Sequence, residues 1–80
     1  KDAKSRLQEF VQAESLPTPK YQVVGSSGPD HDKNFTVRVQ VDGKAWGTGT
    51  GKNKSIAEQN AAQEALESHL VKKAENRYNS

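Results

Sequence analysis

The chain has 80 residues, enough for one small domain, and its 12 Lys and Arg outnumber its 10 Asp and Glu by only two. The absence of cysteine excludes disulfide scaffolds, cysteine-based zinc sites and thiol catalysis. Because the formal net charge is only +2, the positions of the charges are more informative than their sum.

The first predicted element is an amphipathic helix over residues 2–14. Its apolar side chains recur at the three- and four-residue spacing that lines one helix face, at Ala3, Leu7, Phe10 and Val11. Asp2 is a suitable N-cap. The helix should end before Pro17 and Pro19, because each proline removes a backbone donor and restricts the residue before it.

The middle of the chain predicts three strands. Residues 21–24 carry β-favouring side chains, and the Gly, Ser, Asp and Asn residues within 25–34 predict a loop after them. Residues 35–41 alternate apolar and polar side chains, which is typical of a half-buried antiparallel strand. The polar face of this strand is expected to face water, with Thr36, Arg38 and Gln40.

Asp42-Gly43 predicts a two-residue type I′ hairpin turn into the third strand. The pairs that follow from this turn are Val41 with Lys44, Val39 with Trp46 and Val37 with Thr48. This register places Trp46 on the apolar face of the sheet, whereas a slip by one residue would turn it outward. Residues 47–53 are expected to leave the strand.

A second helix is predicted from Lys54 to at least Leu70, and residues 72–80 are expected to extend it and then fray. A broad stripe of small and apolar side chains lines one face: Ala57, Ala61, Ala62, Ala65, Leu66 and Leu70. The alanines would let this helix pack closely on the sheet or on the first helix. Two caps are consistent with the sequence, namely Asn53, or Ser55 with Glu58 as a capping box.

The element order α-β-β-β-α predicts an α+β fold, a two-layer sandwich with two helices on one face of a three-stranded antiparallel sheet. The domain is expected to span residues 1–71, with residues 72–80 as a helical extension or frayed tail. No apolar run reaches the roughly 18 residues that span a membrane, and residues 1–15 lack the apolar centre of a signal peptide. We therefore expect a soluble, cytoplasmic chain, and the absence of an initial methionine suggests a fragment of a larger protein.

The motifs of common catalytic sites do not fit this sequence. Trp46 and Asn53 stand where a Walker A phosphate loop needs Gly and Ser or Thr. Asp30, His31 and Asp32 lie on a predicted loop with no visible nucleophile, so an acid–base role is not expected for them.

Three sets of polar residues remain as candidate ligand contacts. They are the outer side of the first helix (Ser5, Gln8, Glu9, Gln12), the loop tip (Gly28, Pro29, His31) and three lysines within an 11-residue stretch that contains no acid (Lys44, Lys52, Lys54), of which Lys52 and Lys54 lie at the start of the second helix. Free backbone N–H groups and the helix dipole already favour an anion at that helix start. Uncharged hydrogen-bonding side chains beside a cationic helix end suggest a ligand with phosphates and hydroxyls, which points to RNA. Each set taken alone is also consistent with an ordinary solvated surface.

The sequence resembles the double-stranded RNA-binding domain over roughly residues 2–70. Short motifs carry the resemblance, in order and at the spacing of the family: Leu7-Gln8-Glu9, Pro19-x-Tyr21, Gly28-Pro29-x-His31-x-x-x-Phe35 and Gly49-x-Gly51-Lys52-Asn53-Lys54-Ser55-x-Ala57-Glu58. Each motif is weak alone, and the set is specific. The opening Asp2-Ala3-Lys4-Ser5 and the Leu16-Pro17-x-Pro19 turn are most similar to the C-terminal domain of bacterial ribonuclease III.

The resemblance implies binding of double-stranded RNA through its shape, its 2′-hydroxyls and its phosphates. The contacts would span two minor grooves and the intervening major groove, with weak sequence preference and little affinity for DNA. The implied contact residues are Ser5, Gln8, Glu9 and Gln12, then Gly28, Pro29 and His31, and finally Lys52, Asn53, Lys54 and Ser55. At Ser55 the chain departs from the family, which usually has a second lysine there. Lys52 would compensate, and Ser55 would still be able to hydrogen-bond a phosphate.

The resemblance also implies that this chain has no active site, metal or cofactor of its own. The parent would be a double-strand-specific endoribonuclease whose separate nuclease domain binds Mg²⁺ and forms a homodimer, whereas the fragment would be a monomer. The alternative is a protein-interaction module on the same fold that has lost RNA binding. Such a module would be expected to lack the lysines at the helix start and His31, both of which are present.

Overall fold

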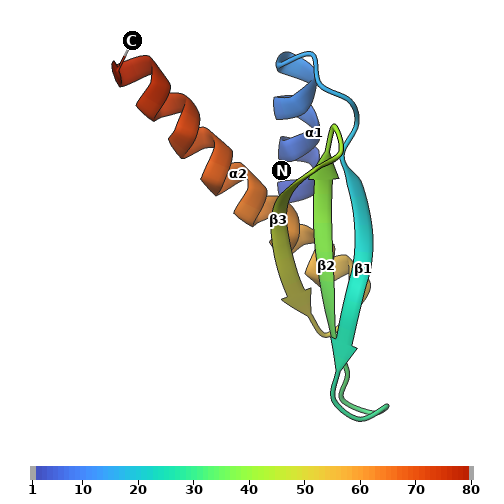
Figure 1. Cartoon of the computed structure of the whole chain (residues 1–80). Helices are drawn as coiled ribbons and strands as arrows, with labels where there is room; N and C mark the ends of the chain where they lie inside the picture. The colour runs from blue at the N-terminus through green and yellow to red at the C-terminus, as the bar shows by residue number, and fades with distance from the viewer. Residues whose placement is uncertain (1, 80) are drawn as a thin grey trace.

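The computed structural model describes the backbone of residues 2–79 and the side chains of residues 2–72. Its elements are α1 (Ala3–Ala13), β1 (Lys20–Ser27), β2 (Asn34–Val41), β3 (Lys44–Gly51) and α2 (Lys54–Asn79). The strands form an antiparallel sheet in the order β1-β2-β3, and both helices lie on the same side of it (Figure 1). The predicted α-β-β-β-α fold is confirmed. Within the described chain, no helix combines the length and apolar character needed to cross a membrane.

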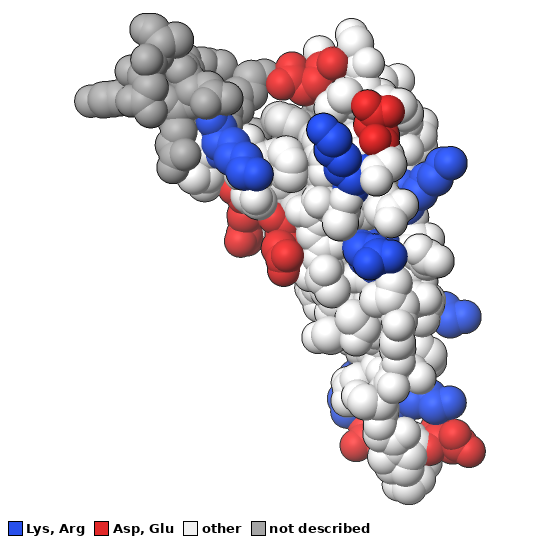
Figure 2. All heavy atoms as spheres, viewed as in Figure 1, with Lys and Arg blue, Asp and Glu red and all other residues white. Residues whose placement is uncertain are grey.

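The helices cover one face of the sheet and leave the other face open. Figure 2 views the molecule from the open side, where basic side chains are scattered and form no continuous cationic patch. The outward side chains of the central strand, Thr36, Arg38 and Gln40, are half-buried because β1 and β3 flank them.

The first helix begins and ends where local chemistry dictates. The Asp2 carboxylate accepts a hydrogen bond from the Ser5 N–H at 2.8 Å, which confirms the predicted N-cap. Ser15 takes a left-handed conformation with φ of 59°, and the Leu16 N–H then donates to the Val11 carbonyl at 2.8 Å. Leu7 and Val11 are completely buried, so this helix faces the core along its predicted stripe.

β1 is longer than the sequence suggests. It continues through Gly25, Ser26 and Ser27, which were predicted to lie in a loop. The register shifts between Val23 and Gly25, so a β-bulge absorbs the extra residue and the polar residues beyond it still pair with β2. The prediction failed because Gly and Ser disfavour strands by local propensity, and pairing with β2 overrides that preference.

The β2–β3 hairpin has the predicted turn but a different register. Asp42 and Gly43 both have positive φ, 54° and 77°, as a type I′ turn requires, and Val41 pairs with Lys44. Beyond the turn, the predicted pairings of Val39 with Trp46 and of Val37 with Thr48 are wrong. A shift between Val39 and Gln40 pairs Val39 with Gly47 and Val37 with Gly49. Trp46 is the extra residue at this bulge, and its ring still packs against the core.

The shifted register places glycines of β3 directly beneath α2. A Cβ on Gly49 would lie 2.2 Å from the backbone nitrogen of Ala61, and one on Gly47 would lie 2.7 Å from the Ala61 carbonyl oxygen. Residues 47–51 therefore belong to β3 and do not leave the strand as predicted. Here strand and helix backbones meet with no side chain between them, which is the close packing that the alanine stripe indicated.

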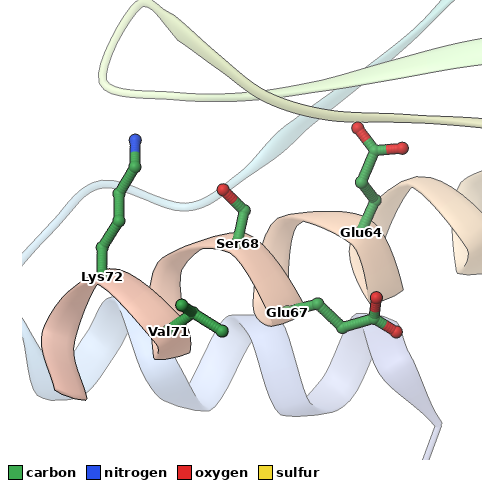
Figure 3. A pocket seen from close by; sticks show the side chains of 5 residues that line it. All are labelled: Glu64, Glu67, Ser68, Val71 and Lys72. Atoms are coloured by element: carbon green, nitrogen blue, oxygen red, sulfur yellow. The ribbon is translucent and has the colours of Figure 1, made fainter. Parts of the chain in front are cut away.

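Polar side chains of α2 also reach the outer edge of β3. The Thr48 N–H donates to Glu64 Oε1 at 3.2 Å, and Asn60 Nδ2 donates to the Thr50 carbonyl at 2.7 Å. Figure 3 shows Glu64 directed towards the neighbouring strand, beside a shallow groove that Glu67, Ser68, Val71 and Lys72 also line. These two bonds satisfy strand groups that have no further strand to pair with.

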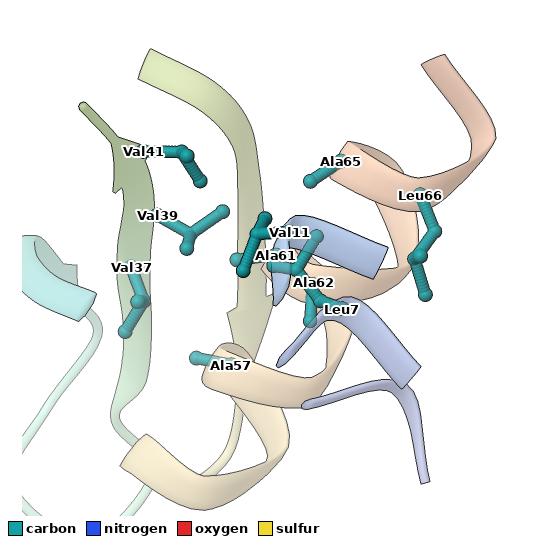
Figure 4. Packing of buried hydrophobic residues seen from close by; sticks show 10 residues of the cluster. All are labelled: Leu7, Val11, Val37, Val39, Val41, Ala57, Ala61, Ala62, Ala65 and Leu66. Atoms are coloured by element: carbon teal, nitrogen blue, oxygen red, sulfur yellow. The ribbon is translucent and has the colours of Figure 1, made fainter. Parts of the chain in front are cut away.

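The core lies between the sheet and the helices (Figure 4). Its buried residues come from α1, β2 and α2: Leu7, Val11, Val37, Val39, Val41, Ala57, Ala61, Ala62, Ala65 and Leu66. Leu70, which was predicted to continue the stripe, is 43% exposed, because α2 has by then extended beyond the sheet. At the border of the core, the Trp46 ring stacks on His69 with 3.6 Å between ring centroids.

α2 continues as a helix to Asn79, as the predicted extension requires. The boundary between a domain of residues 1–71 and a tail of residues 72–80 stays a prediction. The side chains of 73–80, and any fraying there, lie outside the described residues.

Candidate nucleic-acid interface

The first candidate set follows one outward stripe of α1. Ser5, Gln8, Glu9 and Gln12 stand at helical positions i, i+3, i+4 and i+7, away from the buried Leu7 and Val11. Three of the four side chains are exposed and Gln8 is half-buried. The backbone hydrogen bond from Ser5, followed by the hydrogen bond from its side chain, lowers the pKa of Asp2 below its usual 3.8. The cap is therefore ionised at neutral pH, and it fixes the start of the stripe.

The second set is a tightly folded loop tip between β1 and β2. Gly28 has φ of +91°, and a Cβ there would lie 2.4 Å from the Asp32 carbonyl oxygen. The Asp32 N–H donates to the Pro29 carbonyl at 2.9 Å and closes a four-residue turn that contains His31. Gly28, Pro29 and His31 are all exposed. The loop therefore presents them from a defined turn.

Of the third set, Lys52 and Lys54 lie at the N-terminus of α2, whereas Lys44 pairs with Val41 at the opposite end of β3 and does not belong to this cluster. Lys52, Asn53, Lys54 and Ser55 are all exposed, and the first turn of α2 contains no acidic residue. Asn53 is the N-cap: its Oδ1 accepts the Ile56 N–H at 2.9 Å and its carbonyl accepts the Ala57 N–H at 3.1 Å. Ser55 lies inside the first turn, so the alternative capping box does not form. The side-chain oxygen of Asn53 is engaged in capping, which leaves its amide N–H groups as the donors it can offer to a ligand.

Two ion pairs link the elements that carry the three sets. Lys4, in the first turn of α1, places its Nζ 2.7 Å from Glu58 Oε1 of α2, and its N–H donates to Gln59 Oε1 at 3.2 Å. Lys52 Nζ lies 2.5 Å from Asp32 Oδ1 of the loop tip. The start of α2 is thus linked to α1 on one side and to the loop on the other.

The three sets also follow one another along the molecule. In Figure 1 the β1–β2 loop lies at one end of the sheet, the start of α2 comes next, and α1 lies beyond it. The cationic helix end is therefore the middle element, between a hydrogen-bonding helix stripe and a loop tip.

A half-buried tyrosine lies under the junction of the two helices. Lys4 Nζ lies 4.9 Å from the centroid of the Tyr21 ring, and burial, followed by the charges of Glu58 and Asp2, raises the pKa of Tyr21 to about 12. Sequence patterns did not indicate Lys4, Asp32, Glu58 or Gln59 as residues of this surface. Their contacts join residues up to 55 positions apart. The periodicity of a sequence indicates only which residues share a face of one helix or strand, so it cannot reveal such pairs.

The described residues include no group of three or more His, Asp or Glu side chains that could hold a metal ion. The prediction that Mg²⁺ is bound only by a separate nuclease domain stays a prediction.

Comparison with protein families decides the identity of the fold. The family model of the double-stranded RNA binding motif matches residues 3–69, which include all three candidate sets. The chain belongs to this family. Membership in the double-stranded RNA-binding domain family confirms the resemblance stated from the sequence and supports binding of double-stranded RNA.

Known relatives of this RNA-binding domain include bacterial enzymes named ribonuclease 3. The chain is 50% identical over 66 residues to that of Natranaerobius thermophilus and 51% identical over 67 residues to that of Sulfurovum sp. strain NBC37-1. These alignments cover 82% and 84% of this chain, which spans only 29% and 30% of the two relatives.

Solved structures give the same fold for this domain. A structure of Arabidopsis HYL1 matches with a TM-score of 0.73 at 42% identity, covering 85% of this chain and 96% of the other. Dicer from Pichia stipitis matches with a TM-score of 0.66 at 29% identity, covering 81% of this chain and 31% of Dicer.

Proposed function

We propose that this domain binds double-stranded RNA as an A-form rod, with little regard to base sequence. The α1 stripe and the loop tip would each enter a minor groove, and Lys52 and Lys54 would contact the phosphates across the intervening major groove. Such domains span about 16 base pairs in this way. The observation that carries the proposal is that a cationic helix start lies between the other two sets and is bonded to neighbours of both.

The chemistry of the three sets suits a duplex of RNA better than one of DNA. The minor groove of an A-form helix is shallow and displays 2′-hydroxyls, which amide and carboxylate side chains such as Gln8 and Glu9 can hydrogen-bond. Its base edges lie in a deep, narrow major groove that side chains cannot read. We therefore expect little affinity for DNA and only weak preference among RNA sequences.

We further propose that the domain delivers substrate to a ribonuclease III. The relatives named ribonuclease 3 support this, and the remaining seven tenths of their length leave room for a catalytic unit. Cleavage, Mg²⁺ binding and homodimer formation would then belong to that unit. The isolated domain would be a monomer, and the parent enzyme would act in the cytoplasm.

Titration of one labelled duplex, followed by fluorescence anisotropy, tests the RNA-binding proposal. The RNA should contain about 20 base pairs, to exceed the site of about 16, and a DNA duplex of the same sequence serves as the competitor. We expect saturable binding of the RNA that weakens steeply with salt, and much weaker binding of the DNA. Equal binding of both duplexes, or of neither, would contradict the proposal.

A paired variant tests the assigned phosphate contacts. Lys52→Ala/Lys54→Ala should weaken binding of every duplex sequence and reduce the slope of log affinity against log salt by about two units. Lys20→Ala is the matched control, because Lys20 is exposed on β1, outside the three sets. An unchanged slope in the double variant would exclude these two lysines as phosphate ligands.

A further inference from the structure

An ion pair connects the loop tip of residues 28–33 to the start of α2. Its contribution to folding does not account for its presence. Lys52 Nζ lies 2.5 Å from Asp32 Oδ1, and both side chains are more than half exposed, 64% for Lys52 and 58% for Asp32. Exposed ion pairs of this kind contribute little to stability, because water and salt screen them. The other described ion pair of the tip joins Asp30 and Lys33, both within the loop itself.

Asp32 is held firmly by the loop that it tethers. Its N–H donates to Pro29 at 2.9 Å, and its carbonyl oxygen occupies the space in which a side chain at Gly28 would lie. The backbone of Asp32 is therefore part of the turn that contains His31, and its short side chain carries the carboxylate directly from this turn.

The other partner of the ion pair, Lys52, also belongs to a well-defined stretch of backbone. Lys52 directly precedes Asn53, whose side chain and carbonyl cap α2, and it directly follows Gly51, at the end of β3. A lysine ammonium has three N–H donors, so a bond to Asp32 leaves two for a phosphate oxygen. Lys52 can therefore hold the loop and contact RNA at the same time.

We infer that Asp32 is a positioning residue for RNA binding: through Lys52 it holds the β1–β2 loop at a fixed distance from the N-terminus of α2, so that both reach one duplex without reorganisation. The inference rests on the proposed function. Pre-ordering is effective because each flexible side chain immobilised on binding otherwise lowers affinity. Asp32 itself need not touch the RNA.

If Asp32 positions the loop, removing its charge should change the RNA affinity in the direction opposite to that expected from charge alone. Removing an acidic charge next to a phosphate-binding lysine should tighten RNA binding if charge alone matters. Loss of a tether should weaken it. Asp32→Asn separates the two, because Asn is as favourable as Asp in turns and nearly identical in shape, but lacks the charge that pairs with Lys52.

The experiment measures the affinity of the whole chain for an RNA duplex of about 20 base pairs, together with its unfolding midpoint in urea. We expect Asp32→Asn to weaken binding about 3- to 10-fold, roughly 0.7 to 1.4 kcal/mol, with an unchanged midpoint. Asp30→Asn is the matched control in the same loop, since its partner Lys33 belongs to the loop too, and it should not weaken binding. In a Lys52→Gln background, Asp32→Asn should have no further weakening effect.

Each alternative result is decisive. If the unmodified chain binds RNA but Asp32→Asn binds equally or more tightly, the positioning role is wrong while the proposed function stands. Equal weakening by Asp30→Asn, weakening that persists without Lys52, or a lowered unfolding midpoint also overturns it. If the unmodified chain does not bind the duplex, the proposed function and the inference fail together.

Discussion

Replacing Gly49 by alanine tests whether direct contact between strand and helix backbones holds this domain together. The added Cβ would lie 2.2 Å from the Ala61 nitrogen and 2.6 Å from the Ala57 carbonyl oxygen, both well inside the 3.4 Å at which ordinary contact begins. Backbone atoms of a helix cannot rotate away as a side-chain end can, so α2 would have to lift from β3. Overpacking of cores costs about 1–3 kcal/mol, and we expect the upper end of that range or beyond.

The measurement is urea unfolding followed by the fluorescence of Trp46, the single tryptophan of the chain. Its ring lies between Phe10, 6.1 Å away edge-on, and the stacked ring of His69, so it reports on the packing of α1, β3 and α2. Gly25→Ala is the matched control, because Gly25 also lies in a strand but has open space around its added Cβ. The control should be neutral or more stable by up to about 1 kcal/mol.

A third glycine separates crowding from backbone strain. Gly43→Ala meets no atom within 4 Å, but its φ of +77° disfavours any side chain, so it should cost about 1–2 kcal/mol through strain alone. The expected order of stability is therefore Gly25→Ala, then Gly43→Ala, then Gly49→Ala. If Gly49→Ala unfolds at the same urea concentration as Gly25→Ala, the close approach of β3 and α2 does not exist in solution.

Three further predictions concern the cap, the loop and the half-buried tyrosine. Asn53→Ala should lower the unfolding free energy by about 1 kcal/mol in urea titrations, whereas Asn53→Asp should keep the cap and weaken RNA binding in anisotropy titrations through its added negative charge. Gly28→Ala should strain the loop by about 1–3 kcal/mol and shift the NMR resonances of His31; unchanged resonances would refute the tight turn. The folded-state pKa of Tyr21, about 12, lies above the ordinary 10.0, so folding favours the protonated phenol, and its stabilising contribution should be lost as pH rises from 10 through 12. Tyrosinate absorbance should show this late titration in the intact chain and lose it in Tyr21→Phe.

Much of the fold could be predicted because the periodic segments are strong. The alternation over residues 35–41, the Asp42-Gly43 turn and the alanine spacing of α2 each match one kind of structure, and each was confirmed. The errors lie where tertiary contacts override local preference. Ser26 and Ser27 extend β1 because β2 offers them partners, and a bulge beside Gln40 shifts every later pair by one residue. A bulge leaves no clear signal in a sequence read by alternation alone.

For the candidate surface, too, the sequence indicated the residues but not their arrangement. Residue types and motif spacing indicated all three sets, and the structure leaves Lys54, His31 and Gln12 exposed. Their mutual arrangement was not readable from the sequence, because it depends on how α1 and α2 pack on the sheet (Figure 1), which brings together residues as far apart as Lys4 and Gln59. The glycines of β3 were misassigned for a related reason. Without the position of α2, a glycine that admits a helix backbone looks the same as one that ends a strand.

The bonds from Asn60 and Glu64 to β3 have a consequence for how the domain behaves among its own copies. An open sheet has two borders, and an unpaired border can recruit another chain and start aggregation. At β3 the Thr48 N–H and the Thr50 carbonyl are already hydrogen-bonded to side chains of α2. A neighbouring strand would therefore have to displace Glu64 and Asn60 before it could pair with these groups. At β1 the irregularity beside Val23 bends the border away from the straight geometry that intermolecular pairing needs. Both borders of the sheet thus carry, within the domain's own secondary structure, a feature that disfavours pairing with a second copy.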